Sequence, residues 1–169
     1  SDPDRARETV FDLADLLRSY VRFAERHMVS VAEEMHLASL YLSLQQRRFQ
    51  GRLSVSMEVD PETADIPIPS LLLQPVVENT IKWAVAPYAQ PATIRLVTRL
   101  HGDRMSIEVL DSGPRFDEAR IVEGDGFRIL RKTLDLQYRD DYALSLRATA
   151  EGGVFSLDLP RKPAGDYRG

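Results

Sequence analysis

A short segment of the chain places a carboxylate, a carboxamide and an ammonium group close together. Within residues 71–83, Glu78, Asn79 and Lys82 lie one, three and four positions apart, so an α-helix would bring them to one face. A carboxamide oxygen can ligate Mg²⁺, a Lys can bind phosphate, and a carboxylate can orient or deprotonate an attacking group. The spacing is therefore compatible with a magnesium-nucleotide site, although most helices with this pattern simply present a solvated face.

The opposite face of the same segment is apolar. Leu73, Val77, Ile81 and Ala84 recur at steps of three or four residues, which is typical of a helical stripe buried in a core. We therefore predict a helix from about residue 69 to residue 85 that carries the three polar residues over a hydrophobic base.

Two helices are predicted before this segment. The first ends near residue 24, and the second opens with a capping box of Ser30 and Glu33 and stops near Gly51. Because the link is short, the two should lie antiparallel. Their apolar stripes are wider than one helix pair can bury, so we expect a partner chain to cover part of them; the alternative is that both helices simply cover a sheet. The stripes comprise Val10, Phe11, Leu13, Leu16, Leu17, Tyr20, Val21, Phe23 and Ala24, and then Met35, Ala38 and Leu42.

The rest of the chain alternates strands with one helix. The pattern predicts strands at residues 53–59, 92–100, 105–110, 142–149 and 154–159, and a helix at residues 127–138. This order favours an α+β or α/β sandwich, in which helices cover one face of a mixed sheet.

Composition limits the function. The 169 residues carry a formal net charge of -4 and no cysteine, which argues against broad nucleic-acid binding and excludes thiol chemistry. No run of 18 apolar residues occurs, so this stretch does not span a membrane. The histidines, His27, His36 and His101, have no metal-like spacing.

Residues 71–84 resemble the N box of the LytS/YehU-type sensor histidine kinases, within the GHKL ATPase superfamily. The matching residues are Gln74, Pro75, Val77, Glu78, Asn79, Ile81 and Lys82. Asp111-Ser112-Gly113, by itself typical of an ordinary turn, stands where that family has its G1 box, and Gly124-Asp125-Gly126 stands at its G2 box. The resemblance implies a Bergerat-type ATP-binding fold.

The resemblance also implies roles for single residues. Asn79 would ligate Mg²⁺ at the phosphates of ATP, and Glu78 would activate or position the attacking group. Lys82 would contact phosphate, and Asp111 would accept a hydrogen bond from the adenine amino group. Gly113 would let the backbone pass close to the base, while Gly124 and Gly126 would begin a mobile lid.

At the level of the whole chain, the resemblance implies three parts: residues 1–50 as partial dimerisation helices, 51–162 as the ATP-binding domain and 163–169 as a tail. The expected function is phosphorylation of a His on a helix upstream of Ser1, followed by transfer to a response regulator. Homodimerisation through residues 1–50 is expected, as is a cytoplasmic position in a bacterial inner-membrane protein, with the membrane reached only through the upstream region.

Several residues depart from the family pattern, and all lie at the expected nucleotide site. Trp83-Ala84 replaces His-Gly, Arg115 and Arg128 replace glycines, Arg131 replaces an Asn, and Val154 replaces a Thr. The arginines could pair with phosphate. Alternatively the pocket is degraded, and the chain is a kinase-like interaction and dimerisation module with weak or no nucleotide binding.

Overall fold

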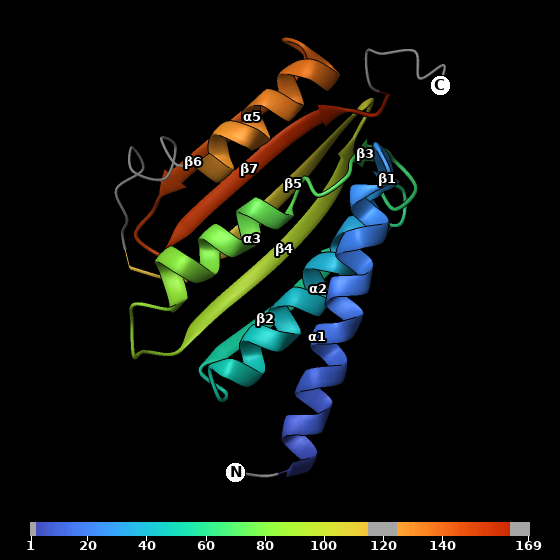
Figure 1. The fold of residues 1–169 in the computed structure, drawn as a ribbon. Coiled ribbons are helices and arrows are strands. Elements are labelled where there is room, and N and C mark those ends of the chain that lie inside the picture. Colours follow the sequence, from blue (N-terminus) through green and yellow to red (C-terminus); the bar gives the residue numbers. More distant parts are fainter. Residues whose placement is uncertain (1–2, 115–124, 163–169) are drawn as a thin grey trace.

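The computed structural model describes residues 3–114 and 125–162 and contains one mixed five-stranded sheet (Figure 1). The strand order is β2-β4-β5-β7-β6, in which β2 and β4 are parallel and all other neighbours are antiparallel. The strands are β2 (Leu53–Val59), β4 (Ala92–His101), β5 (Arg104–Asp111), β6 (Ala143–Ala148) and β7 (Gly153–Pro160). All five follow the strands expected from the sequence to within two residues, and the expected fold class is confirmed.

Among the described residues, three helices cover one face of this sheet: α2 (Val31–Arg48), α3 (Gln74–Thr80) and α5 (Asp125–Tyr138) (Figure 1). The strands alternate, so that residues such as Ile107 and Leu157 face the helices and are buried. The helices supply buried residues such as Leu42, Val77 and Leu134 to the same core. On the other face of the sheet, Glu58 pairs with Arg95 and Arg99 at 2.8 Å. The apolar base expected for the segment around residue 80 is confirmed, because Leu73, Val77, Ile81 and Ala84 all belong to the buried core.

The first helix, α1 (Pro3–Ala24), lies antiparallel to α2, as expected. Arg47 near the end of α2 forms ion pairs with Glu8 at 3.2 Å and Asp12 at 3.0 Å. A second, smaller core joins the other end of the pair, and its buried members are Leu16, Phe23, Val29 and Leu37. Helix α1 thus packs through this second core, whereas α2 belongs to the main one. The division of the chain at residue 50 stays a prediction.

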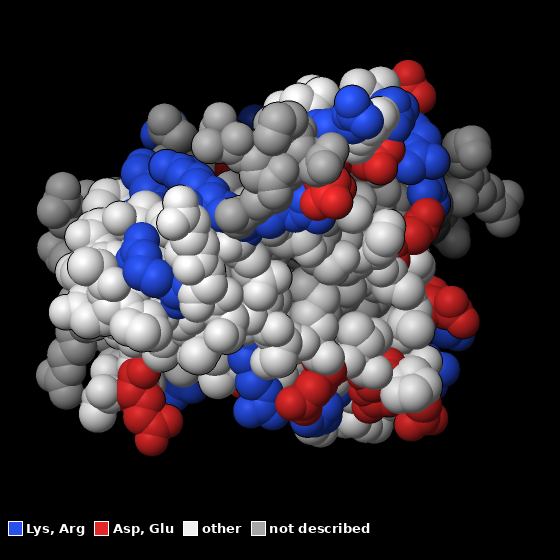
Figure 2. Space-filling view, turned by 90° about the horizontal axis from the view of Figure 1, so that it is seen from below, with Lys and Arg blue, Asp and Glu red and all other residues white. Residues whose placement is uncertain are grey.

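Much of the apolar stripe of α1 lies at the surface of this chain. Val10, Leu17 and Val21 are 65%, 55% and 62% exposed, and Phe11 and Leu13 are exposed beside them. The stripe predicted from the sequence therefore exists, but α2 covers only its flank at Leu16 and Phe23. Figure 2 views the molecule from below Figure 1, and there most Lys, Arg, Asp and Glu lie along the upper and lower margins of a broad area of other residues, with a basic side chain in its left part.

Two short strands were not predicted from the sequence. β1 (Met28–Ser30) pairs antiparallel with β3 (Pro67–Pro69), between the α1–α2 link and the segment before α3. The helix expected to begin near residue 69 consequently begins at Gln74, and its early proline is Pro75, at the first turn. Pro67 and Pro69 therefore belong to an extended segment. Each proline also favours an extended backbone for the residue that precedes it.

A buried carboxylate holds the residues between β3 and α3. The side chain of Glu34, on α2, is 1% exposed. One oxygen accepts the backbone N–H of Leu71 at 2.5 Å and the other that of Leu73 at 3.1 Å. Burial raises the pKa of Glu34 to about 7, against the lowering effect of the backbone N–H groups of residues 71–73.

This buried carboxyl should make stability depend on pH. Its pKa is about 7 in the folded protein and 4.5 in the unperturbed group, so between these values the folded state binds the extra proton. The free energy of unfolding should therefore fall as the pH rises from about 5 to about 8, by at most on the order of 3 kcal/mol, because one pKa unit corresponds to about 1.4 kcal/mol. Urea titrations across this range measure the effect.

The variant Glu34→Gln should lose this part of the pH dependence. Glu33→Gln is the control, because Arg26 holds the pKa of Glu33 at about 2 and that residue does not titrate in the window. Identical pH profiles for the wild type and Glu34→Gln would contradict the assignment.

Candidate functional site

A pocket lies between α3 and α5, over the end of β5. Counted with its open mouth, it encloses about 430 Å³. Its walls are mostly apolar, and its polar side chains come from two elements, the α3 helix and the end of β5. The lining residues are Pro75, Val76, Asn79, Thr80, Trp83, Ala84, Asp111, Phe127, Leu130, Leu146 and Phe155. Phe127 and Phe155 meet edge to face, with their ring centroids 6.4 Å apart.

Asn79 lies at the side of the pocket where α5 begins. A Cβ added to Gly126, in the first turn of α5, would lie 3.6 Å from Nδ2 of Asn79 and 3.5 Å from Cβ of Pro75. The backbone of α5 therefore approaches the Asn79 carboxamide closely. The structure thus brings together two of the predicted site residues, Asn79 and Gly126. The other glycine of that motif, Gly124, lies outside the described residues.

Asp111 ends β5 and is held by two backbone groups. Its Oδ1 accepts the N–H of Gly113 at 2.9 Å and that of Gly153 at 3.2 Å. Burial raises the pKa of Asp111, while these two hydrogen bonds act to lower it. Among the described residues no donor to Oδ2 is found, so that oxygen can accept a hydrogen bond from a ligand.

Gly113 brings two backbones into contact. A Cβ at this position would lie 2.6 Å from Cβ, 2.8 Å from Cα and 2.9 Å from the carbonyl oxygen of Ala84. Ala84 belongs to a π-helical turn, η1 (Ile81–Val85), which continues α3 and is closed by a hydrogen bond of 2.8 Å from Ala86 N–H to the Ile81 carbonyl. In this structure Gly113 therefore permits the end of β5 to pack directly on η1.

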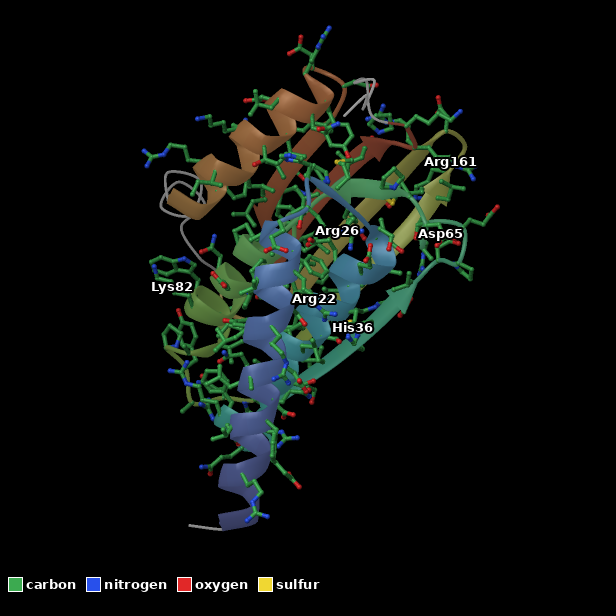
Figure 3. All side chains as sticks on the ribbon, turned by 45° about the vertical axis from the view of Figure 1, so that its right-hand side comes forward. Arg22, Arg26, His36, Asp65, Lys82 and Arg161 are labelled. Atoms are coloured by element: carbon green, nitrogen blue, oxygen red, sulfur yellow. The ribbon has the colours of Figure 1, made fainter. Side chains whose placement is uncertain are left out.

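Glu78 and Lys82 do not line the pocket, although both lie one turn or less from Asn79. Glu78 accepts a hydrogen bond of 2.7 Å from Nε2 of Gln74. Burial raises the pKa of Tyr41 on α2 to about 12, and the negative charge of Glu78 adds to this rise. Burial also raises the pKa of Tyr20 on α1, and the charge of Glu78 again contributes. Glu78 is exposed, and it lies near enough to the α1–α2 pair for its charge to act on both tyrosines. Lys82 is exposed on η1, with its Nζ 4.9 Å from the ring centroid of Trp83 (Figure 3).

Comparison with known proteins shows similarity to sensor histidine kinases. A family model described as histidine kinase matches residues 1–53. The sensor histidine kinase YesM of Bacillus subtilis is 32% identical over 150 residues, which are 86% of this chain and 26% of that protein. The sensor protein LytS of Oceanobacillus iheyensis is 30% identical over 173 residues, 94% of this chain and 30% of that protein. This chain is a relative of the LytS-type sensor histidine kinases. It spans between a quarter and a third of the length of these two relatives.

Solved structures of histidine kinases share the fold. The catalytic domain of ThkA superposes with a TM-score of 0.63 at 17% identity, over 80% of this chain and 97% of that domain. The histidine kinase domain of the blue-light activated kinase of Erythrobacter litoralis gives a TM-score of 0.62 at 17% identity, over 90% of this chain and 74% of that one. The expected Bergerat-type fold, preceded by two helices, is therefore confirmed.

Some of the departures from the pattern of the LytS-type kinases lie at this pocket. Trp83 is one of its walls, and the Arg131 guanidinium stacks over the Phe127 ring at 5.8 Å. Val154 is half-buried in β7 opposite Leu110. Arg128 is exposed on α5, and Arg115 lies outside the described residues. Sequence reasoning missed Phe127 and Phe155 as pocket walls, and their only signal was the apolar periodicity of the elements that carry them.

The two described glycines of the site should respond differently to a methyl group. Gly113→Ala should lower the free energy of unfolding by about 2 kcal/mol or more, because its Cβ would meet backbone atoms of Ala84 that cannot move aside. Gly126→Ala should change it by less than about 1 kcal/mol, since its Cβ has only ordinary contacts and Ala favours a helix. Denaturant unfolding of both variants tests this, and equal losses would contradict the close contact between β5 and η1.

Proposed function

We propose that this chain is the ATP-binding catalytic region of a two-component sensor histidine kinase. It would bind Mg-ATP in the pocket between α3 and α5 and present the γ-phosphate to a His on a helix upstream of Ser1. The observation that carries this proposal is that Asn79 and Asp111, two chemically distinct polar residues, line one apolar pocket. Kinship with sensor histidine kinases supports it.

The adenine would bind at the Asp111 end. A carboxylate that already accepts two backbone N–H groups through Oδ1 is held in one orientation, and its Oδ2 would accept the exocyclic amino group. Buried aromatic residues, Phe127 and Phe155, and the indole of Trp83 supply the apolar surface that a purine needs. Trp83 in place of the usual His therefore suits a nucleotide pocket.

The phosphates would bind at the Asn79 end, beside the first turn of α5, whose backbone N–H groups suit an anion. The described residues contain no group of three or more His, Cys, Asp or Glu that could hold a metal ion. Mg²⁺ ordinarily takes one or two protein oxygens together with phosphate oxygens and water. Asn79 fits such a site, in which the metal would neutralise phosphate charge, and Lys82 would add a further cation.

Glu78 would serve the acceptor side of the reaction. Glu78 is exposed on α3, and its charge acts on Tyr20 of α1 and Tyr41 of α2, so it lies on the side of α3 nearer the α1–α2 pair. A His delivered by a helix that continues or joins α1 would approach from this side. Glu78 would then orient the imidazole or take its proton, which is the role of a general base.

A second copy of the chain would cover the exposed stripe of α1. Val10, Leu17 and Val21 lie at intervals of seven and four residues, which suits a helix-to-helix seam.

A response regulator would receive the phosphoryl group. The histidine kinase ThkA has been solved in complex with the response regulator TrrA, with a TM-score of 0.59 and 14% identity to this chain. No helix in the described ranges has the length and apolar character needed to cross a bilayer.

Nucleotide binding is tested by calorimetric titration with a non-hydrolysable ATP analogue, with and without Mg²⁺. We expect magnesium-dependent binding that Asn79→Ala reduces at least about tenfold, since a metal ligand is lost. Asp111→Asn should weaken binding with or without the metal. Lys82→Ala should weaken binding because a cation near the phosphates is lost, and Lys132→Ala, an exposed Lys on α5, is its control. Absence of binding at millimolar analogue would reject the catalytic assignment and favour an interaction module built on the kinase fold.

Dimerisation is tested by sedimentation equilibrium of the variant Leu17→Glu/Val21→Glu. Two charges in an apolar helix seam should raise the dimer dissociation constant at least about a hundredfold, because each would be buried without a partner. Leu136→Glu, which changes a leucine that is 78% exposed on α5, is the control and should leave association unchanged. A wild-type chain that stays monomeric at high concentration would refute this interface.

A further inference from the structure

The junction between α1 and α2 is bonded along its length to the segment that leads into α3. Ser70 donates its N–H to the His27 carbonyl at 3.0 Å, and the β1–β3 ladder follows. Beyond that ladder, Val31 N–H donates to the Ile66 carbonyl at 3.0 Å. Residues 64–70 are therefore attached to the start of α2. They are also attached to the backbone of α1, because Ser70 Oγ donates to the Phe23 carbonyl at 2.7 Å.

Glu34 extends this attachment to the last residues before α3. Its two carboxylate oxygens accept the N–H groups of Leu71 and Leu73, and its side chain is almost completely buried. The N-cap of α3, Leu73, has no side-chain capping bond of its own. Glu34 therefore binds the N–H of the N-cap residue itself from a different helix, where a negative charge also suits the helix dipole.

The backbone that Glu34 holds is strained. Leu71 has a φ of 60°, in the left-handed region, which costs a non-glycine residue about 1–2 kcal/mol. Such a conformation persists only where its surroundings impose it. The geometry of the turn into α3 thus depends on the carboxylate that binds its N–H groups.

We propose that Glu34 is a positioning residue for the nucleotide site. It holds the turn at residues 71–73, and because α3 begins directly after this turn, it sets where Asn79 and Glu78 lie. A displacement of α2 would be passed through this carboxylate to the helix that carries both residues. Figure 3 shows the end of α1, with Arg22 and Arg26, beside α2 with His36. The assignment of Asn79 and Glu78 to catalysis rests on the proposed function, whereas the mechanical link does not.

The test compares Glu34→Gln with Glu33→Gln at pH 8.5. Both variants remove one carboxylate from the same turn of α2, but Glu33 contacts Arg26 and Ser30 instead of residues 71–73. A carboxamide has one acceptor oxygen and one NH₂ donor, so in the place of the carboxylate it would set that donor against one of the two backbone N–H groups. Amide hydrogen exchange at residues 71–80, the fluorescence of Trp83, which is the sole tryptophan, and titration with the Mg²⁺-bound ATP analogue are the three readouts.

In Glu34→Gln we expect exchange at residues 71–80 to accelerate at least tenfold while amides of β4 and β5 stay within twofold of those in Glu33→Gln. The Trp83 emission should shift, and affinity for the analogue should fall about tenfold. Glu34→Asp keeps the charge and should give an intermediate result, and it replaces Glu34→Gln if that variant does not fold.

Equal exchange at residues 71–80 in the two Gln variants would overturn the proposal. So would an acceleration spread evenly over the sheet, because Glu34 would then contribute only to global stability. If the wild type does not bind the analogue, the proposed function fails, while the exchange and fluorescence results still decide whether Glu34 positions α3.

Discussion

The close backbone contact between β5 and η1 is the constraint on which the pocket depends. Gly113 has no room for a side chain against Ala84, and a Cβ at Gly152 would lie 1.8 Å from the Asp111 carbonyl oxygen. These two contacts press the end of β5 against η1 on one side and against the β6–β7 turn on the other. Asp111 and Asn79 consequently line one pocket because the backbones that carry them cannot separate without losing packed surface.

The helix α3 stands between two environments of different character. Toward α5 and the sheet it presents Asn79 to an apolar, aromatic pocket. On the side of α1 and α2 it carries Glu78, which bonds to Gln74 of the same helix and whose charge acts on Tyr20 and Tyr41. In a phosphoryl-transfer enzyme the attacking and leaving oxygens lie in line on opposite sides of the phosphoryl group that moves, and the metal bridges the phosphate oxygens on the leaving side. A helix with one polar residue on each side is suited to that division.

The α1–α2 pair is attached in a way that suits transmission of a signal. Helix α2 shares the main core with the sheet, whereas α1 has only the small second core, two ion pairs at its other end and a bare apolar stripe. Rearrangement of α1 therefore disturbs few buried contacts of the main core. Its motion can reach α3 through the β1–β3 ladder, because those hydrogen bonds join the α1–α2 link to the segment before α3.

Local sequence patterns were sufficient for the elements whose signals are short-range. The capping box of Ser30 and Glu33 formed as predicted, with hydrogen bonds of 3.2 and 2.8 Å, because both partners lie within one turn. The strand at residues 53–59 was predicted to the residue from period-two alternation. The β1–β3 pair was not, since three-residue strands carry no periodicity and their partners lie about forty residues apart in the chain.

The sequence by itself determined the order of elements, the apolar base of α3, and, through its resemblance to a kinase family, which residues to examine at the site. Only the tertiary structure decided that Asn79 and Glu78 face different neighbours, that Lys82 lies outside the pocket, and that Glu34 is buried against residues 71–73. The physical reason is that adjacent residues on a helix point about 100° apart. Which neighbour each one meets depends on how α2, α5 and the sheet surround that helix, and those contacts join residues far apart in the chain.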